Sequence, residues 1–355
     1  MIKFISLLSS AFLYSQVSMA ASNVNLCLPS GREEVVIISM LMAKEKGYFQ
    51  KHDLNINLIV AKNEQNKVIQ MPKRAEKNLT AFKNSLMNSG IEKDFNIENK
   101  KCDISVINVE SFLARPEMIP HFRPLHMVTY GESYDTNLVV SSDSKINSLK
   151  DLVGKNVRLG RVPTYAAIEK GMNEEGLKLN DLKSSREQVT EILPALNQHS
   201  LVAAVSYFPT MPAMIATGKV KVLKASIYKN YLKIPIPKSV VVASTGFYQK
   251  NQDVIQRFIT ALSEAEDYGN KNPSQLAMVF KNTTKLMGMK SWEIKNNEIE
   301  KIDEFYTAFQ PIFFNQKNVN IEGKNYSPIS IIEDYNLLLR NSGYVSSVAD
   351  FSSWK

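Results

Sequence analysis

The sequence predicts an α/β fold with two lobes, each built on a mainly parallel sheet that is flanked by helices. Strand and helix patterns alternate as βαβαβ up to residue 131, and a second alternating set begins at Thr136. From Gln249 onward the patterns are mostly helical. We therefore expect two sheet-centred halves joined by crossing strands near residues 130–136 and 240–244, with the C-terminal helices returning to cover the first half.

The first half begins with a short strand, "VNLCL", and a loop, "PSGREE". "VVIISMLMAKEK" is helical and ends at Gly47, which lacks the Cβ that disfavours a left-handed closing position. "LNINLIV" alternates apolar and polar residues as a half-buried strand does. Further patterns are a helix in "RAEKNLTAFKNSLMNSG", a strand, turn and helix in "CDISVINVESFLAR", and a strand in "FRPLHMVTYG".

The second half opens with the strand "TNLVVSSDS" and a short helix, "SLKDLVGK", that closes at Gly154. "NVRLGR" is a strand, and proline in the first turn favours a helix in "PTYAAIEKGMNEEG". The patterns "LVAAVSYF", "PTMPAMIATG" and "KVKVLKAS" indicate strand, helix and strand. "KSVVVASTGF" contains an uninterrupted β-branched run, Val240 to Val242, as a buried or lobe-crossing strand does. The helical patterns after it add no new sheet, and they are "QDVIQRFITALSEAEDYG", "PSQLAMVFKNTTKLMG", "NNEIEKIDEFYTAF" and "PISIIEDYNLLLRNSG".

Composition and the first residues indicate an exported, soluble protein. The chain of 355 residues is 44% hydrophobic and 22% charged, and its net charge of +8 is spread over many lysines. Residues 1–20 combine Lys3, an apolar stretch and small residues before Ala20, which is the pattern of a secretory signal peptide cleaved after Ala20. No later run reaches the roughly 18 apolar residues that a membrane span needs. We expect a periplasmic location.

The two cysteines leave two alternatives open. Cys27 and Cys102 lie in or beside strand patterns, and export permits a disulfide between them. If the strands are parallel neighbours, the two cysteines can sit at different heights, where the narrow geometry of a disulfide is not met. A disulfide and a pair of buried thiols are therefore both compatible with the sequence.

Catalytic and metal-binding patterns are missing from the sequence. The histidines are scattered, without the spacing of a metal site: His52, His121, His126 and His199. There is no Gly-x-Ser-x-Gly elbow and no glycine-rich phosphate loop. The lysine-rich runs lack interleaved aromatic residues and are better explained as solvated helix faces than as a nucleic-acid site. We expect no enzyme activity, no cofactor, no bound metal and no nucleic-acid partner.

Two motifs stand out in the chain. The first is a helix ending in Ala-x-x-x-Gly-Tyr/Phe-Phe before a turn, Leu and a strand, here Ala43, Gly47, Tyr48, Phe49 and Leu54. The second is "DSKINSLKDLVGK", with matches at Asp143, Ser144, Ile146, Ser148, Leu149, Asp151, Leu152, Gly154 and Lys155. Together they resemble the periplasmic substrate-binding proteins of ABC importers, in the nitrate/sulfonate/taurine (NMT1/THI5-like) family, which also includes binders of pyrimidine precursors of thiamin. The resemblance covers nearly all of the mature chain and implies the type II fold of these proteins, with a ligand held between the lobes.

We therefore expect a signal peptide at 1–20, a first lobe at 21–132 and 245–355, and a second lobe at 133–244, and this organisation fits the family. Two departures stand out. Residues 61–101 form a longer link than is usual in the family, which predicts an extra helix or flap. The Asp-Ala that often precedes a late strand of the second lobe is here Ala203-Ala204, so that a carboxylate is missing.

Four loops should then face the ligand. "PSGREE" offers backbone amides at Ser30 and Gly31 and a guanidinium at Arg32. "NVES" places Asn108, Glu110 and Ser111 at a helix N-terminus, where Glu110 disfavours a simple anion or pairs with an amine of the ligand. The other two loops contribute a cation, a hydroxyl and aromatic rings: Arg161, Thr164 and Tyr165 in "GRVPTYAA", and Tyr207 in "SYFPTMP".

These observations predict a monomeric solute-binding protein that delivers a small polar ligand to the permease of an ABC importer at the inner membrane. A sulfonate, another oxyanion or a pyrimidine-type heterocycle fits the candidate residues. The alternative is a sensory or interaction protein that has kept the fold and lost the ligand, which the long insert and the missing Asp favour. An enzyme that acts on a pyrimidine precursor is a third and more distant alternative.

Overall fold

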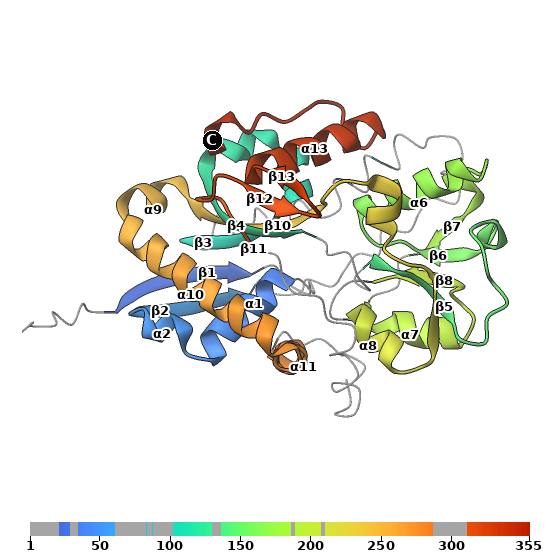
Figure 1. Cartoon of the computed structure of the whole chain (residues 1–355), viewed down its shortest axis with the longest axis horizontal. Coiled ribbons are helices and arrows are strands. Elements are labelled where there is room, and N and C mark those ends of the chain that lie inside the picture. The colour runs from blue at the N-terminus through green and yellow to red at the C-terminus, as the bar shows by residue number, and fades with distance from the viewer. Residues whose placement is uncertain are drawn as a thin grey trace, which may run out of the picture.

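The computed structural model describes residues 21–28, 35–60, 83, 87, 102–129, 136–185, 189–206, 210–286 and 311–355. Its elements form two groups, each centred on a sheet (Figure 1). Outside the described residues lie the predicted signal peptide at 1–20, most of the insert at 61–101, the crossing segment at 130–135 and the helix predicted at 296–309.

The first lobe is built on a six-stranded sheet with the order β11-β4-β10-β3-β1-β2. β1 pairs in parallel with β2 and β3, while β10 runs antiparallel to both β3 and β4. Four of the six strands, β1 to β4, therefore share one direction. The bounds are β1 Ser22–Leu28, β2 Leu54–Val60, β3 Ile104–Asn108, β4 Phe122–Thr129, β10 Pro237–Ser244 and β11 Pro311–Phe313.

Helices cover both faces of this sheet (Figure 1). α1, α2, α10 and α11 pack on one face, where α1 contributes the buried run Ile37 to Ala43. α5 and α13 lie toward the other face, together with the small β12–β13 hairpin. The bounds are α1 Val35–Glu45, α2 Tyr48–Lys51, α5 Val109–Ala114, α9 Thr245–Lys250, α10 Gln252–Lys271, α11 Pro273–Leu286, α13 Pro328–Asn341, β12 Val319–Ile321 and β13 Lys324–Tyr326.

The second lobe is built on a five-stranded sheet with the order β7-β6-β8-β5-β9. β6 pairs in parallel with β7 and β8, and β5 runs antiparallel to β8 and β9. Four strands again share a direction, with β5 opposed. The bounds are β5 Leu138–Ser141, β6 Asn156–Arg158, α6 Val162–Glu174, β7 Lys183–Ser185, α7 Val189–Asn197, β8 Ala203–Val205, α8 Thr210–Ala216 and β9 Val220–Lys224.

Two glycines close local structure as their positions in the motifs predict. Gly47 has φ 75° between α1 and α2, and Gly154 has φ 72° after a single turn of 3₁₀-helix, Lys150–Leu152. Asp151, within this turn, accepts through Oδ2 the N–H groups of the preceding residues Asn147 and Ser148, each at 3.0 Å. These bonds, that of Asn147 first, lower the pKa of the Asp151 carboxyl. The segment "SLKDLVGK" thus forms a capped turn, which is shorter than the helix predicted there.

The chain returns to the first sheet earlier than the sequence indicated. The predicted second lobe ran to residue 244, but β10 occupies the middle of the first sheet from Pro237 onward. Its β-branched run is buried on both faces, because Val240 and Val242 pack in one apolar cluster and Val241 packs in the other. Both edges of the strand are paired, one with β3 and the other with β4. The expectation of no new sheet after residue 249 was also wrong, since β12 pairs with β13 in a separate two-stranded sheet. In addition, β11 extends the first sheet.

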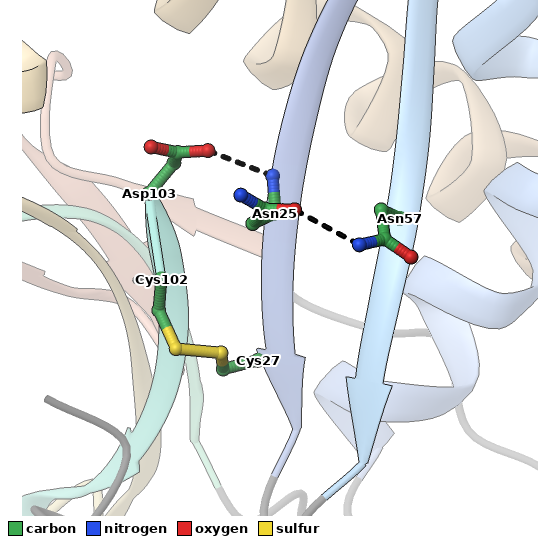
Figure 2. The surroundings of a disulfide bond; sticks show 5 residues. All are labelled: Asn25, Cys27, Asn57, Cys102 and Asp103. Atoms are coloured by element: carbon green, nitrogen blue, oxygen red, sulfur yellow. Dashed lines mark hydrogen bonds between the residues drawn. A yellow bond between two sulfur atoms is a disulfide. The ribbon is translucent and has the colours of Figure 1, made fainter. Parts of the chain in front are cut away.

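Cys27 and Cys102 form a disulfide, with their Cα atoms 5.8 Å apart (Figure 2). Leu26 pairs with Ile104, so a straight continuation of β3 would put Cys102 level with Val24. The chain instead bends at Asp103, whose carboxylate accepts the N–H of Asn25 at 2.8 Å, and this brings Cys102 back to Cys27. The bond ties the residue that begins the β3 segment to β1.

The two lobes are packed against each other. One cluster of buried apolar side chains contains residues of both, such as Ile107 and Val240 from the first lobe and Leu138 and Val157 from the second. Ala213 and Ala216 of α8 belong to the cluster that otherwise lines the first lobe's other face. Among the described residues, no helix is both long and apolar enough to cross a membrane.

Candidate functional site

The candidate site begins where β3 ends. Asn108 is the last residue of β3 and the residue before α5, so that Glu110 and Ser111 fall in the first turn of this helix. All three side chains are buried. The short "NVES" stretch therefore places polar groups at the carboxyl edge of the parallel strands, where α/β proteins bind ligands.

Arg161 reaches this edge from the second lobe. It is the N-cap residue of α6, three residues after β6 ends. Its Nη2 donates to Asn108 Oδ1 at 2.9 Å and to Glu110 Oε2 at 3.1 Å. Three residues that the sequence singled out on two loops, one in each lobe, thus meet at this junction.

Two further side chains of the first lobe form hydrogen bonds with Asn108 and Glu110. Ser239 Oγ of β10 donates to Asn108 Oδ1 at 3.0 Å, and the Tyr335 hydroxyl of α13 donates to Glu110 Oε1 at 2.9 Å. Both oxygens of the mostly buried Glu110 carboxylate therefore have partners within the protein. The Arg161 charge compensates the Glu110 charge, which a buried carboxylate requires. In this structure the charged partner of Glu110 is the guanidinium of Arg161. Pairing of Glu110 with an amine of the ligand stays a prediction.

Thr164 and Tyr165 lie on the buried side of α6. Thr164 Oγ1 is 2.7 Å from the hydroxyl of Tyr228, and the Tyr165 hydroxyl is hydrogen-bonded to Ser184 Oγ of β7. The Tyr165 ring is 1% exposed and belongs to the large apolar cluster. These contacts give both residues a role in packing. The other predicted site residues, Ser30, Gly31, Arg32 and Tyr207, lie outside the described residues.

A second polar contact between the lobes was not predicted from the sequence. Lys83, one of two described residues of the insert, has its Nζ 2.8 Å from Glu169 Oε1 of α6 and 2.7 Å from the Ser342 carbonyl oxygen. The same Nζ lies 4.7 Å from the centroid of the Tyr344 ring. Burial, and then the Glu169 charge, raise the pKa of Tyr344 well above its usual value. α6 therefore contacts the first lobe through a cation at its N-terminus and an anion two turns later.

The sequence reasoning also missed polar residues at the edge of the second sheet. Arg158 ends β6, and its Nη1 donates to the Val205 carbonyl oxygen at 2.6 Å. Asn137 precedes β5, and its Oδ1 accepts the N–H of Ser226 at 2.8 Å. Ser206 directly follows β8. In the sequence, each of these residues is a polar residue at the boundary of an apolar strand. Ordinary loops show the same pattern, so it does not distinguish a site residue.

The four histidines do not form a cluster. His126 Nε2 lies 3.0 Å from Glu266 Oε1 in the core of the first lobe, where both side chains are fully buried. Within the described parts of the chain, no three His, Cys, Asp or Glu residues form a group that could hold a metal ion.

Residues 96–276, just over half of the chain, match the model of the family described as NMT1/THI5 like. The chain belongs to the NMT1/THI5-like family. The recognition of this family in the sequence is thereby confirmed. Comparison with curated proteins finds no match.

Solved structures show the same fold as this member of the family. The periplasmic aliphatic sulphonate binding protein SsuA from Escherichia coli has a TM-score of 0.59 at 16% identity, over 93% of this chain and 95% of that one. The alkanesulfonate-binding protein SsuA from Xanthomonas axonopodis pv. citri, bound to MOPS, has a TM-score of 0.58 at 11% identity, over 94% and 97%. The predicted fold class, the two-lobed type II fold of periplasmic binding proteins, is confirmed.

The same fold also carries catalysis. The desulfurization enzyme DSZB has a TM-score of 0.54 at 10% identity, over 94% of this chain and 95% of that one. At such identities the likeness establishes the architecture alone, and function has to be argued from the residues at the site.

Proposed function

We propose that the protein captures a small polar solute between its two lobes and delivers it to the permease of an ABC importer. Membership of the NMT1/THI5-like family supports this proposal, and so does the structural similarity to sulfonate-binding proteins. The ligand classes are those expected from the sequence: a sulfonate or other oxyanion, or a pyrimidine-type heterocycle.

The contact of Arg161 with Asn108 and Glu110 carries the proposal. It joins the carboxyl edges of the two sheets through side chains of opposite charge. A solute that touches both edges stabilises the closed arrangement in which they meet, and the closed form is the one that a permease can distinguish from the open form. A protein whose lobes served only as a rigid scaffold would have little need for buried charged groups at this junction, because burying them is costly.

The disulfide supports export to an oxidising compartment. Disulfides persist in the periplasm and are rare in the cytosol. Cys27 and Cys102 are bonded to each other, and the sequence before residue 21 has the pattern of a cleaved signal peptide. We therefore propose that the mature protein begins after Ala20 and works in the periplasm as a monomer.

The test is a thermal-shift screen of the mature protein against a broad panel of sulfonates, oxyanions, amino acids and pyrimidines. A solute at 100 times its Kd stabilises the folded state by about 2.7 kcal/mol, which is readily detected as a rise in Tm. Replacing Arg161 by Ala should abolish the response, whereas replacing the exposed Arg340 by Ala should preserve it. If no solute in the panel stabilises the wild-type protein, capture for transport is refuted.

The rival function, a sensory or interaction protein without a ligand, is favoured by one observation. Arg161 and both oxygens of Glu110 are engaged by the protein's own side chains. Under this alternative the panel would give no shift, and the gene would lie apart from genes for a permease and an ATPase. A positive shift together with such neighbouring genes would exclude it.

A further inference from the structure

The carboxyl edge of the second sheet carries three buried polar side chains on one face. Leu138 of β5 pairs with Val205 of β8, so one step further along the same register Asn137 lies opposite Ser206. Both are fully buried. Neighbouring residues of a strand point to opposite faces, so both side chains lie on the face opposite to Leu138 and Val205. Arg158, buried at the end of β6, pairs with Ala204 and shares that face.

Two of these side chains present donors that the protein leaves unsatisfied. The backbone N–H of Ser226 can only donate, so its acceptor in Asn137 is Oδ1, and Nδ2 is the remaining donor. Among the described residues, neither Asn137 Nδ2 nor Ser206 Oγ has a hydrogen-bond partner, although both atoms are buried. Folded proteins rarely leave buried polar atoms without partners, because each such atom has lost its water without replacing it.

This edge adjoins the junction between the lobes. Asn137 lies within the first residues described after the chain arrives from the first lobe. Arg161, three residues after Arg158, bonds to Asn108 and Glu110 of the first lobe. β6 and β8 are parallel, so that their carboxyl ends meet at one edge, which is the place where sheets of this kind hold ligands.

We propose that Arg158, Asn137 and Ser206 form a subsite for the oxyanion headgroup of the ligand, a sulfonate or a carboxylate. A guanidinium, an amide N–H and a hydroxyl can all donate to oxygen, and hydrogen bonds to a charged acceptor are the stronger ones. This inference rests on the proposed function and deepens it, because it decides for an anionic ligand over a neutral heterocycle. It also assigns the headgroup to the second lobe, away from the Glu110 carboxylate.

The experiment is calorimetric titration of the mature protein with methanesulfonate, taurine and MOPS in one arm, and acetate and propionate in a second arm. The neutral heterocycle 4-amino-2-methylpyrimidine forms a third arm. Sulfonates or carboxylates should bind the wild-type protein, and which of the two arms binds more tightly identifies the headgroup. Binding of the pyrimidine alone would overturn the subsite and leave solute capture intact. Binding in no arm would overturn the subsite, while the broader thermal-shift panel would still decide on solute capture.

Ser206→Ala is the decisive variant. Its hydroxyl has no partner within the described structure, so its removal should leave Tm unchanged or slightly raised. The affinity for the anion should fall roughly ten- to a hundredfold, since one hydrogen bond to a charged group is lost. Ser353→Ala is the matched control, because Ser353 Oγ is likewise buried without a partner but lies in the first lobe. It should leave the affinity unchanged.

Asn137→Asp is the second variant, because it keeps the acceptor for Ser226 and puts a negative oxygen where Nδ2 stands. Anion binding should then be lost, with the fold checked by circular dichroism. Unchanged anion affinity in Ser206→Ala would overturn the subsite. A drop in the Tm of Ser206→Ala would also overturn it, since the hydroxyl would then be structural. A crystal structure with a water alone between these residues and the anion elsewhere would do the same.

Discussion

Removing the disulfide should destabilise the protein by several kcal/mol. The bond joins residues 75 apart in the sequence, so it closes a long loop that includes α1, β2 and the insert. In the chain-entropy model, closing a loop of this length lowers the conformational entropy of the unfolded chain and so raises its free energy by about 4.5 kcal/mol. Typical proteins are stable by about 5–15 kcal/mol in total, so the loss is a large share of what holds the fold together. We therefore expect a Cys27→Ala/Cys102→Ala double variant to lose about 3–5 kcal/mol.

The assay is urea unfolding of both proteins, followed by circular dichroism and by tryptophan fluorescence so that a single transition can be verified. The slope m should rise in the double variant, because the unfolded chain exposes more surface without the cross-link. Asn57→Ala is a suitable control. The exposed Asn57 amide bonds to Asn25 beside the disulfide (Figure 2), and its loss should cost less than about 1 kcal/mol.

Two results would contradict this reasoning. A loss below about 1 kcal/mol in the double variant would show that the restriction of the unfolded chain is small, for instance because that chain stays compact. An unchanged slope m, together with a large loss, would place the effect in the folded state instead. Reduction of the wild-type protein should reproduce the stability of the double variant.

Three further predictions concern α6 and its neighbours. Lys83→Met and Glu169→Gln should each destabilise the protein by about 2 kcal/mol, because each variant leaves a mostly buried charge unpaired. A double-mutant cycle, measured by urea unfolding, should show that stability is partly recovered when both residues are changed. Additive losses of stability would contradict the pairing. Gly171→Ala should cost about 1–3 kcal/mol in urea unfolding, since its Cβ would lie 2.6 Å from Cζ of Tyr231, and the penalty should vanish in a Tyr231→Ala background. Burial raises the pKa of Tyr344 well above the usual 10.0, so folding favours its neutral form and stability should fall as pH rises past about 10. That fall should be shallower in Tyr344→Phe, and equal slopes would refute the assignment.

Much of the fold could be predicted because its signals are local. β2 alternates with period two, α1 ends at a glycine in the left-handed region, and α6 begins with a proline in its first turn. β11 escaped detection because it has three residues, too few to show a period, and begins with a proline. The boundary at residue 244 was placed too late because a β-branched run is equally suited to crossing between lobes and to the middle of a sheet, where β10 lies.

The candidate site also shows which signals are local. Asn108, Glu110 and Arg161 could be proposed from the sequence because each falls at the end of a recognisable strand or the start of a helix. The direction in which the Tyr165 side chain points could not be predicted from the sequence, since it depends on the packing of α6 against β7. Asn137 and Ser206 are unremarkable in the sequence, because what distinguishes them is a missing partner, and that is a property of the assembled core.

The position of β10 has a consequence for the order in which the protein is made. β3 and β4 are not neighbours in their sheet; β10 separates them, and Ser239 meets Asn108 across 131 residues of chain. Pairings between such distant segments form slowly, because a long loop must close first. The N-terminal sheet therefore has to wait for a strand that leaves the ribosome after the entire second lobe. A nascent chain that folds so late remains unfolded, and therefore competent for translocation, for as long as the proposed export across the inner membrane requires.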